Sequence, residues 1–198
     1  MLSTNYTHPI LALIAALLIL SGAGCQVPET ALRPSFQEDA PSNTMTNSSL
    51  SEQEFMRLYA NVRTALNEPT PDHLLSLLDQ QTTAGKEQYE IFRANWGDQE
   101  AHDTWKRFLP DLVTMPRADY RTNGDWAAYY FEYASKAETT SIDLNVERAH
   151  RVNNEWKLAL GNGGSVAFSS SSDPTVRKQA IQEQIKTSEV LTVEPRAK

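Results

Sequence analysis

The sequence predicts an α+β domain in which helices come first and a meander of four antiparallel strands follows. Between residues 50 and 109, apolar side chains recur every three or four positions, the spacing of one helix face. From residue 118 to residue 160 they alternate with polar side chains, which is typical of half-buried strands. The helical half is expected to end at Pro110, because proline cannot continue a helix.

The first predicted helix begins at a capping box. Ser51 is placed to cap the helix, Glu54 to reach back to the cap, and Leu50 to pack against Phe55. The apolar positions of this helix are Phe55, Leu58, Tyr59, Val62 and Leu66. Pro69 restricts the residue before it, so the helix is expected to end at Glu68.

Two more helices are expected before the strands. The second is short, with Thr70 as its cap, Pro71 at its first position and leucines between 74 and 78 on its apolar side. The third runs from about residue 85 to residue 109. Its inward-facing residues are Tyr89, Phe92, Trp96, Trp105, Phe108 and Leu109. Residues 95–98 break or kink it, because glycine weakens a helix interior.

Four strands form the predicted meander. Residues 118–133 supply two strands around an Asn-Gly turn at 123–124, which is a strong hairpin signal. In the third strand, apolar residues at 142, 144 and 146 alternate with polar residues at 143, 145 and 147. A turn at 152–155 leads into the fourth, and residues 161–164 are expected to end the sheet. Residues 164–198 are then expected to form a polar tail, with a candidate helix from Asp173 that lies loosely on the domain or is detached.

The N-terminus carries an export signal. Residues 10–20 are continuously apolar, too short a run to cross a bilayer comfortably but typical of the core of a secretory signal. Small residues at 21–24 lead to Cys25, the only cysteine, so neither an internal disulfide nor a cysteine-based zinc site is expected.

This segment resembles the lipobox of bacterial lipoproteins, with Ala23 and Gly24 before Cys25. The resemblance implies a signal peptide over 1–24 that is cut before Cys25, which carries a diacylglyceryl group with acyl chains such as palmitate. Gln26, in place of Asp, implies the outer membrane in a Gram-negative cell. Gly22 stands where leucine is usual, and residues 1–9 lack Lys and Arg. Ordinary secretion, with cleavage near Ala23 or Gly24, therefore stays open as an alternative.

Residues 25–49 are expected to be the lipidated cysteine and a flexible tether, because they are rich in Pro, Ser, Thr and Asn. The element order after them, together with the segment 154–158 (Asn-Glu-Trp-Lys-Leu), resembles the NTF2-like (SnoaL-like) superfamily over about residues 50–160. The resemblance implies a cone-shaped domain over 50–163, in which a curved sheet wraps a long helix and often leaves a pocket. Members include isomerases, cyclases, dehydratases and many proteins that only bind or assemble, so the fold does not decide the function.

Six residues are candidates for the lining of such a pocket. Five are the aromatic residues Tyr59, Trp96, Trp105, Tyr129 and Phe131, which could equally fill the core of a small domain. The sixth, Glu132, shares a strand face with Trp126 and Tyr130. That face is either the aromatic-lined concave face or a solvated or interfacial one.

Other polar groups give weaker signals. Asp98 and His102 lie four residues apart and could form a base and its partner, two metal ligands, or a solvated helix face. His150, beside two arginines, is either an anion contact or the polar end of a strand. No phosphate loop, Ser-His-Asp set or zinc-protease motif occurs, so no catalytic residue, metal or cofactor is predicted. The formal net charge of −7 disfavours nucleic acid as a partner.

The sequence therefore predicts a lipid-anchored accessory protein of the cell envelope, facing the periplasm if the cell is Gram-negative. Its partners are the membrane, through Cys25, and an unknown envelope protein or small ligand that the domain binds without catalysis. One alternative is a SnoaL-like envelope enzyme that uses a pocket carboxylate or histidine. Another is an assembly protein that pairs through the face of its sheet.

Overall fold

Five antiparallel strands form a single sheet in the computed structural model, which describes residues 49–133 and 140–195. The predictions for Cys25, the signal peptide and most of the tether fall outside these residues. Helices and strands follow the predicted order, so the α+β class is confirmed. No helix among the described residues has the length and apolar character needed to cross a membrane.

Four helices precede the sheet in the part of the chain from residue 49 on. They are α2 (Glu52–Ala65), α3 (Asp72–Leu77), α4 (Thr83–Ala94) and α5 (Gln99–Phe108). The capping box of α2 is confirmed, with the Ser51 amide donating to Glu54 over 2.8 Å. Of the two alternatives for the third predicted helix, the break at 95–98 is confirmed and the kink is not: α4 ends at Ala94, and Asp98 caps α5. Thr70 does not cap α3, because that helix begins one residue later, after Pro71.

The strands are β1 (Arg117–Asn123), β2 (Trp126–Glu132), β3 (Ser141–Val152), β4 (Glu155–Leu158) and β5 (Gly164–Ser169). The first four pair in chain order, as predicted. The expected end of the sheet at 161–164 is wrong, because the chain turns there and returns along β3 as β5. Gly161 makes this turn possible, with a φ of +79° that glycine adopts without strain.

β3 changes its neighbour in mid-strand. Its first part, 141–146, pairs with β5, and its last part, 149–152, pairs with β4. Glu147 and Arg148 lie between the two ladders. Because successive side chains of a strand point to opposite faces, these two residues face opposite sides of the sheet.

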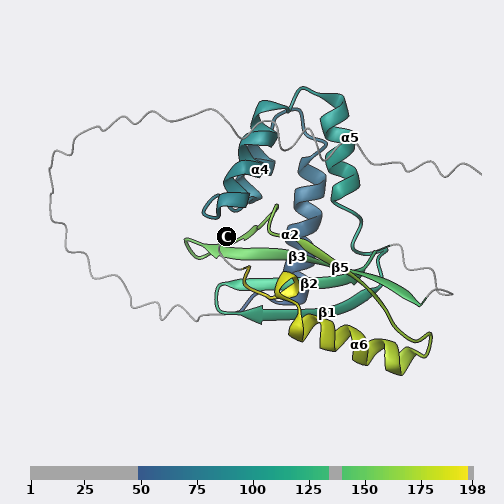
Figure 1. Cartoon of the computed structure of the whole chain (residues 1–198). Helices are drawn as coiled ribbons and strands as arrows, with labels where there is room; N and C mark the ends of the chain where they lie inside the picture. Colours follow the sequence, from purple (N-terminus) through teal and green to yellow (C-terminus); the bar gives the residue numbers. More distant parts are fainter. Residues whose placement is uncertain (1–48, 134–139, 196–198) are drawn as a thin grey trace, which may run out of the picture. The chain divides into compact units, whose positions relative to one another are not determined.

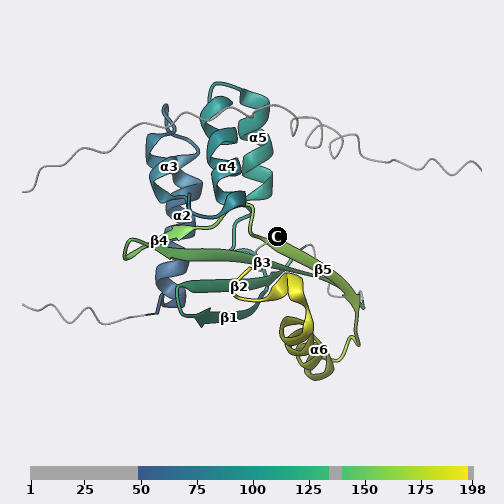
Figure 2. The same cartoon turned by 60° about the vertical axis from the view of Figure 1, so that its left-hand side comes forward.

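Both sides of the sheet are covered (Figures 1 and 2). On the helix side, helices α2 to α5 pack over Ala127, Tyr129, Phe131 and Ala149. On the α6 side, the helix α6 (Pro174–Thr187) and the short 3₁₀ helix η1 (Glu189–Leu191) pack over a second cluster. That cluster contains Ala128, Tyr130, Ile142, Leu144, Val146, Ile181, Ile185 and Leu191. The helix expected from Asp173 is therefore confirmed, and its two buried isoleucines join it to the sheet.

The segment after α6 is held by a buried arginine. Arg148 is only 2% exposed, and its guanidinium donates to the carbonyl oxygens of Asn162, Val190 (2.6 Å) and Thr192 (2.7 and 3.0 Å). The Tyr130 hydroxyl donates to the carbonyl oxygen of Leu191 over 2.7 Å. These bonds satisfy a charge that would be costly to bury alone, and they fix η1 on the sheet.

Candidate ligand-binding site

A carboxyl group lies on the helix side of the sheet, at the point where β3 changes its neighbour. Glu147 pairs directly with Tyr129 of β2, so the two side chains share that side. Glu147 is half-buried there. Burial raises the pKa of the Glu147 carboxyl to about 7, against a smaller opposing effect of the Arg148 charge.

Small residues surround this carboxyl group on the same side. Ala127 and Ala149 are fully buried and face each other across β2 and β3. Gly163 approaches from the loop between β4 and β5, and a Cβ there would lie 3.7 Å from Glu147 Oε2. Residues with larger side chains at these three positions would crowd the carboxyl group.

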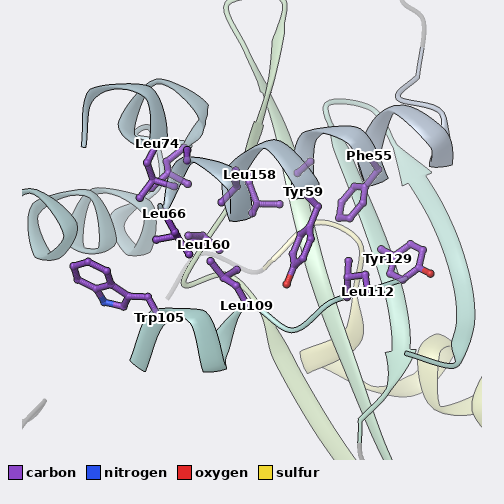
Figure 3. Packing of buried hydrophobic residues seen from close by; sticks show 14 of the residues in the cluster. Phe55, Tyr59, Leu66, Leu74, Trp105, Leu109, Leu112, Tyr129, Leu158 and Leu160 are labelled. Atoms are coloured by element: carbon purple, nitrogen blue, oxygen red, sulfur yellow. The ribbon is translucent and has the colours of Figure 1, made fainter. Parts of the chain in front are cut away.

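The hydroxyl of Tyr59 belongs to the same region. The residue is 2% exposed, and its hydroxyl has no hydrogen-bond partner in the described part of the chain. Burial raises the pKa of this hydroxyl, and the charge of Glu147 raises it further. Figure 3 shows the Tyr59 ring reaching from α2 toward Leu109 and Leu112. We call Glu147, Tyr59, Tyr129 and the three small residues the inner site.

A loop packs beside the inner site. Leu109 and Leu112, which follow α5, are both almost fully buried. Arg63 of α2 holds this loop through a 3.1 Å bond from Nε to the Leu109 carbonyl oxygen and a 3.2 Å ion pair with Asp111. The positive charge of Arg63 is thereby engaged at the loop.

The six predicted pocket residues are only partly brought together. Tyr59, Tyr129 and Phe131 lie in the helix-side core, where Phe55 stacks on both tyrosines with centroids 6.5 and 5.7 Å apart. Trp105 belongs to the same buried cluster, and Trp96 packs against it, with the two ring centroids 6.1 Å apart. The aromatic residues thus mostly fill the core, and two of them border the inner site.

Glu132 lies elsewhere. It faces the α6 side and forms an ion pair with Arg177 of α6. Its strand face is therefore the interfacial one of the two alternatives, and the concave-face alternative does not hold. The carboxyl group on the helix side is Glu147.

Asp98 and His102 do not form a pair. Asp98 Oδ1 accepts from the amides of Glu100 and Ala101 as the cap of α5. The His102 ring nitrogens contact the carbonyl oxygens of Leu66 (3.2 Å) and Trp96 (2.6 Å), and the ring borders an open hollow of about 240 Å³. Within 49–133 and 140–195, no three His, Cys, Asp or Glu side chains come close enough to hold a metal.

His150 belongs to a contact that the sequence did not reveal. Its Nδ1 lies 3.2 Å from Oδ2 of Asp79, a fully buried residue after α3, and its ring stacks on Trp126 at 4.2 Å. Asp79 is 71 positions away in sequence, so no local pattern predicts this pair. The contact ties the helical half to the sheet.

Comparison with known proteins identified no similar protein. The chain matches no family model, no curated protein and no solved structure.

We predict that Glu147 makes stability depend on pH. Its folded pKa lies above its ordinary value of 4.5, so the folded state holds the proton more tightly than the unfolded chain. This contribution is complete below pH 4.5 and is lost as the pH rises toward about 7, by about 1 to 3 kcal/mol. Glu147→Gln should remove this loss, as measured by urea unfolding at several pH values. Asp143→Asn, at an exposed position of the same strand, is the control and should keep it.

We predict opposite effects for two tyrosines on the helix side. Tyr59→Phe removes a hydroxyl without a protein partner, so stability should stay equal or rise by about 1 kcal/mol. Tyr120→Phe removes a hydroxyl that donates to the Leu50 carbonyl oxygen over 2.7 Å, and stability should fall by about 1 kcal/mol. If both variants lost the same free energy of unfolding in urea, the Tyr59 hydroxyl would have to have a hydrogen-bond partner.

Proposed function

We propose that this chain is a lipid-anchored cell-envelope protein whose domain binds a small ligand at the inner site without catalysis. One observation carries the ligand-binding half: the buried hydroxyl of Tyr59 has no hydrogen-bond partner among the described residues, and the charge of Glu147 acts on it. A buried polar group without a partner costs about 1 to 3 kcal/mol, so a chain that keeps one needs a compensating role for it. A ligand that bonds to both groups provides one.

The fold supports this proposal to a limited extent. Helices cover one side of an antiparallel sheet, as in the NTF2-like superfamily, and the inner site lies between those helices and the sheet. An NTF2-like cone remains part of the proposal. Pairing through the sheet face is the weaker alternative, because α6 and η1 occupy the face opposite the helices.

The enzyme alternative gains one specific observation. A carboxyl group whose pKa lies at about 7 is suited to accept or donate a proton near neutral pH. Glu147 would then be the pocket carboxylate of a SnoaL-like enzyme. Turnover of a bound compound by the wild type, and its loss in Glu147→Gln, would favour this alternative over simple binding.

The ligand-binding proposal predicts that the full chain, isolated from its native envelope in mild detergent, carries a small molecule. Native mass spectrometry should show a non-covalent mass increment on the wild type. The double variant Tyr59→Phe, Glu147→Gln should lose it, because both polar contacts are gone. The matched control Tyr120→Phe, Asp143→Asn should retain it. The same increment on all three proteins, or none on the wild type, would contradict binding at the inner site.

The envelope half of the proposal predicts the fate of Cys25. Cys25→Ser removes the thiol that accepts the lipid but leaves the apolar run 10–20 intact, so the variant should be exported without its anchor. Two or more acyl chains hold a protein stably to a membrane, since each buried methylene adds about 0.8 kcal/mol. Mass spectrometry of the membrane fraction should find the mature wild type beginning at a diacylated Cys25. An unmodified thiol, or a mature N-terminus well away from Cys25, would favour simple secretion.

A further inference from the structure

Glu147 has no positively charged partner within the described chain. Arg148, its neighbour in sequence, points to the α6 side and is occupied by three carbonyl oxygens there. Arg63, which acts electrostatically on Tyr59, is engaged by Asp111 and the Leu109 carbonyl oxygen. Carboxylates removed from bulk water are normally paired, and no cation among the described residues pairs with Glu147, so the cation of a ligand would supply the missing positive charge.

The surroundings of Glu147 decide what kind of cation fits. A metal ion would need several oxygen or nitrogen ligands, and the described residues bring no three His, Cys, Asp or Glu together. The ring of Tyr129 lies directly across the strand pair from Glu147, and Tyr59 packs over the same side. Aromatic rings attract organic cations, and an ammonium group can also donate hydrogen bonds to a carboxylate and to a tyrosine oxygen.

We propose that the ligand of the inner site is a small organic cation, whose ammonium group is neutralised by Glu147 and hydrogen-bonded by Tyr59. This inference rests on the proposed ligand-binding function and names the chemical class of the ligand. An anion would meet the like charge of Glu147 in a buried setting. A purely apolar compound would leave both polar groups unsatisfied. The alanines and the glycine beside Glu147 are the smallest side chains available, so they leave the carboxyl group less crowded than larger residues would.

The test compares a cation with its neutral analogue. The full chain in detergent, at about pH 8 and constant low ionic strength, is titrated calorimetrically with n-propylammonium chloride and separately with n-propanol. The ammonium probe should bind roughly tenfold or more tightly than the alcohol, because a charge-assisted contact in a buried site replaces a neutral one.

Variants locate the binding. Glu147→Gln keeps the size of the side chain and should weaken the ammonium probe roughly tenfold or more while leaving n-propanol nearly unchanged. Tyr59→Phe should weaken the ammonium probe severalfold. Asp143→Asn removes a negative charge from an exposed position of the same strand and should have no effect.

Each other outcome overturns a defined part of the inference. Equal binding of both probes, with loss of both in Tyr59→Phe, would contradict the cationic class but leave the ligand-binding site in place. Equal weakening by Glu147→Gln and Asp143→Asn would reduce the effect to general surface charge and contradict the inference. No binding of either probe to the wild type would contradict the inference, and the native mass measurement would then decide separately whether the site binds another class of ligand.

Discussion

The covering of the sheet on both sides is the constraint on which the other features of the domain depend. All seven residues of β2 are buried, although their side chains point alternately to opposite faces. Helices α2 to α5 bury one set and α6 with η1 buries the other. A polar residue of β2 therefore has no route to bulk water on either face, and it needs a partner from a covering element.

Three charged residues of β2 and β3 meet this constraint in different ways. Glu132 receives Arg177 from α6, and Arg148 receives the carbonyl oxygens of the segment around η1. Both partners come from the C-terminal part of the chain, which lies on the α6 side. Glu147 faces the helices instead, and they offer it no cation. The unpaired carboxyl group thus stands out against two neighbours whose charges the fold satisfies.

Local signals in the sequence were enough for most of the helices and strands. The capping box at Ser51 and the turn before β2 each act within a few residues. The capping box is present, and the hairpin forms one residue later than the Asn-Gly signal: Asn123 pairs with Trp126, so Gly124 and Asp125 make the turn. The break before α5 depends on Gly97 and the cap Asp98, which compete with helix propensity. The sequence left a break and a kink equally open, because the cap contact becomes visible only in the structure.

The candidate site could not be predicted, because its chemistry depends on distant contacts. The alternation in β3 indicates one apolar face, and a polar residue at 147 is then expected to meet water. That expectation fails because the apolar face is covered by α6, while the helical half covers the other face. Glu132 was singled out by its aromatic neighbours in sequence, but the same alternation places it on the opposite side from Tyr129. The thin stripe of Ile181 and Ile185 was the one available sign that a second face would be buried.

The alternation of the strand also explains why Arg148 does not neutralise Glu147. Glu147 and Arg148 are adjacent, and in a loop their side chains could meet. In an extended strand they point to opposite sides of the sheet, so the backbone separates the two charges. The Arg148 charge lowers the pKa of Glu147 only partly against the effect of burial, which keeps the carboxyl pKa at about 7. A cation that shares the helix side with Glu147 would act without this separation, and near neutral pH its arrival would favour release of the carboxyl proton. Binding of such a cation at the inner site is therefore expected to be coupled to the ionisation of a single residue.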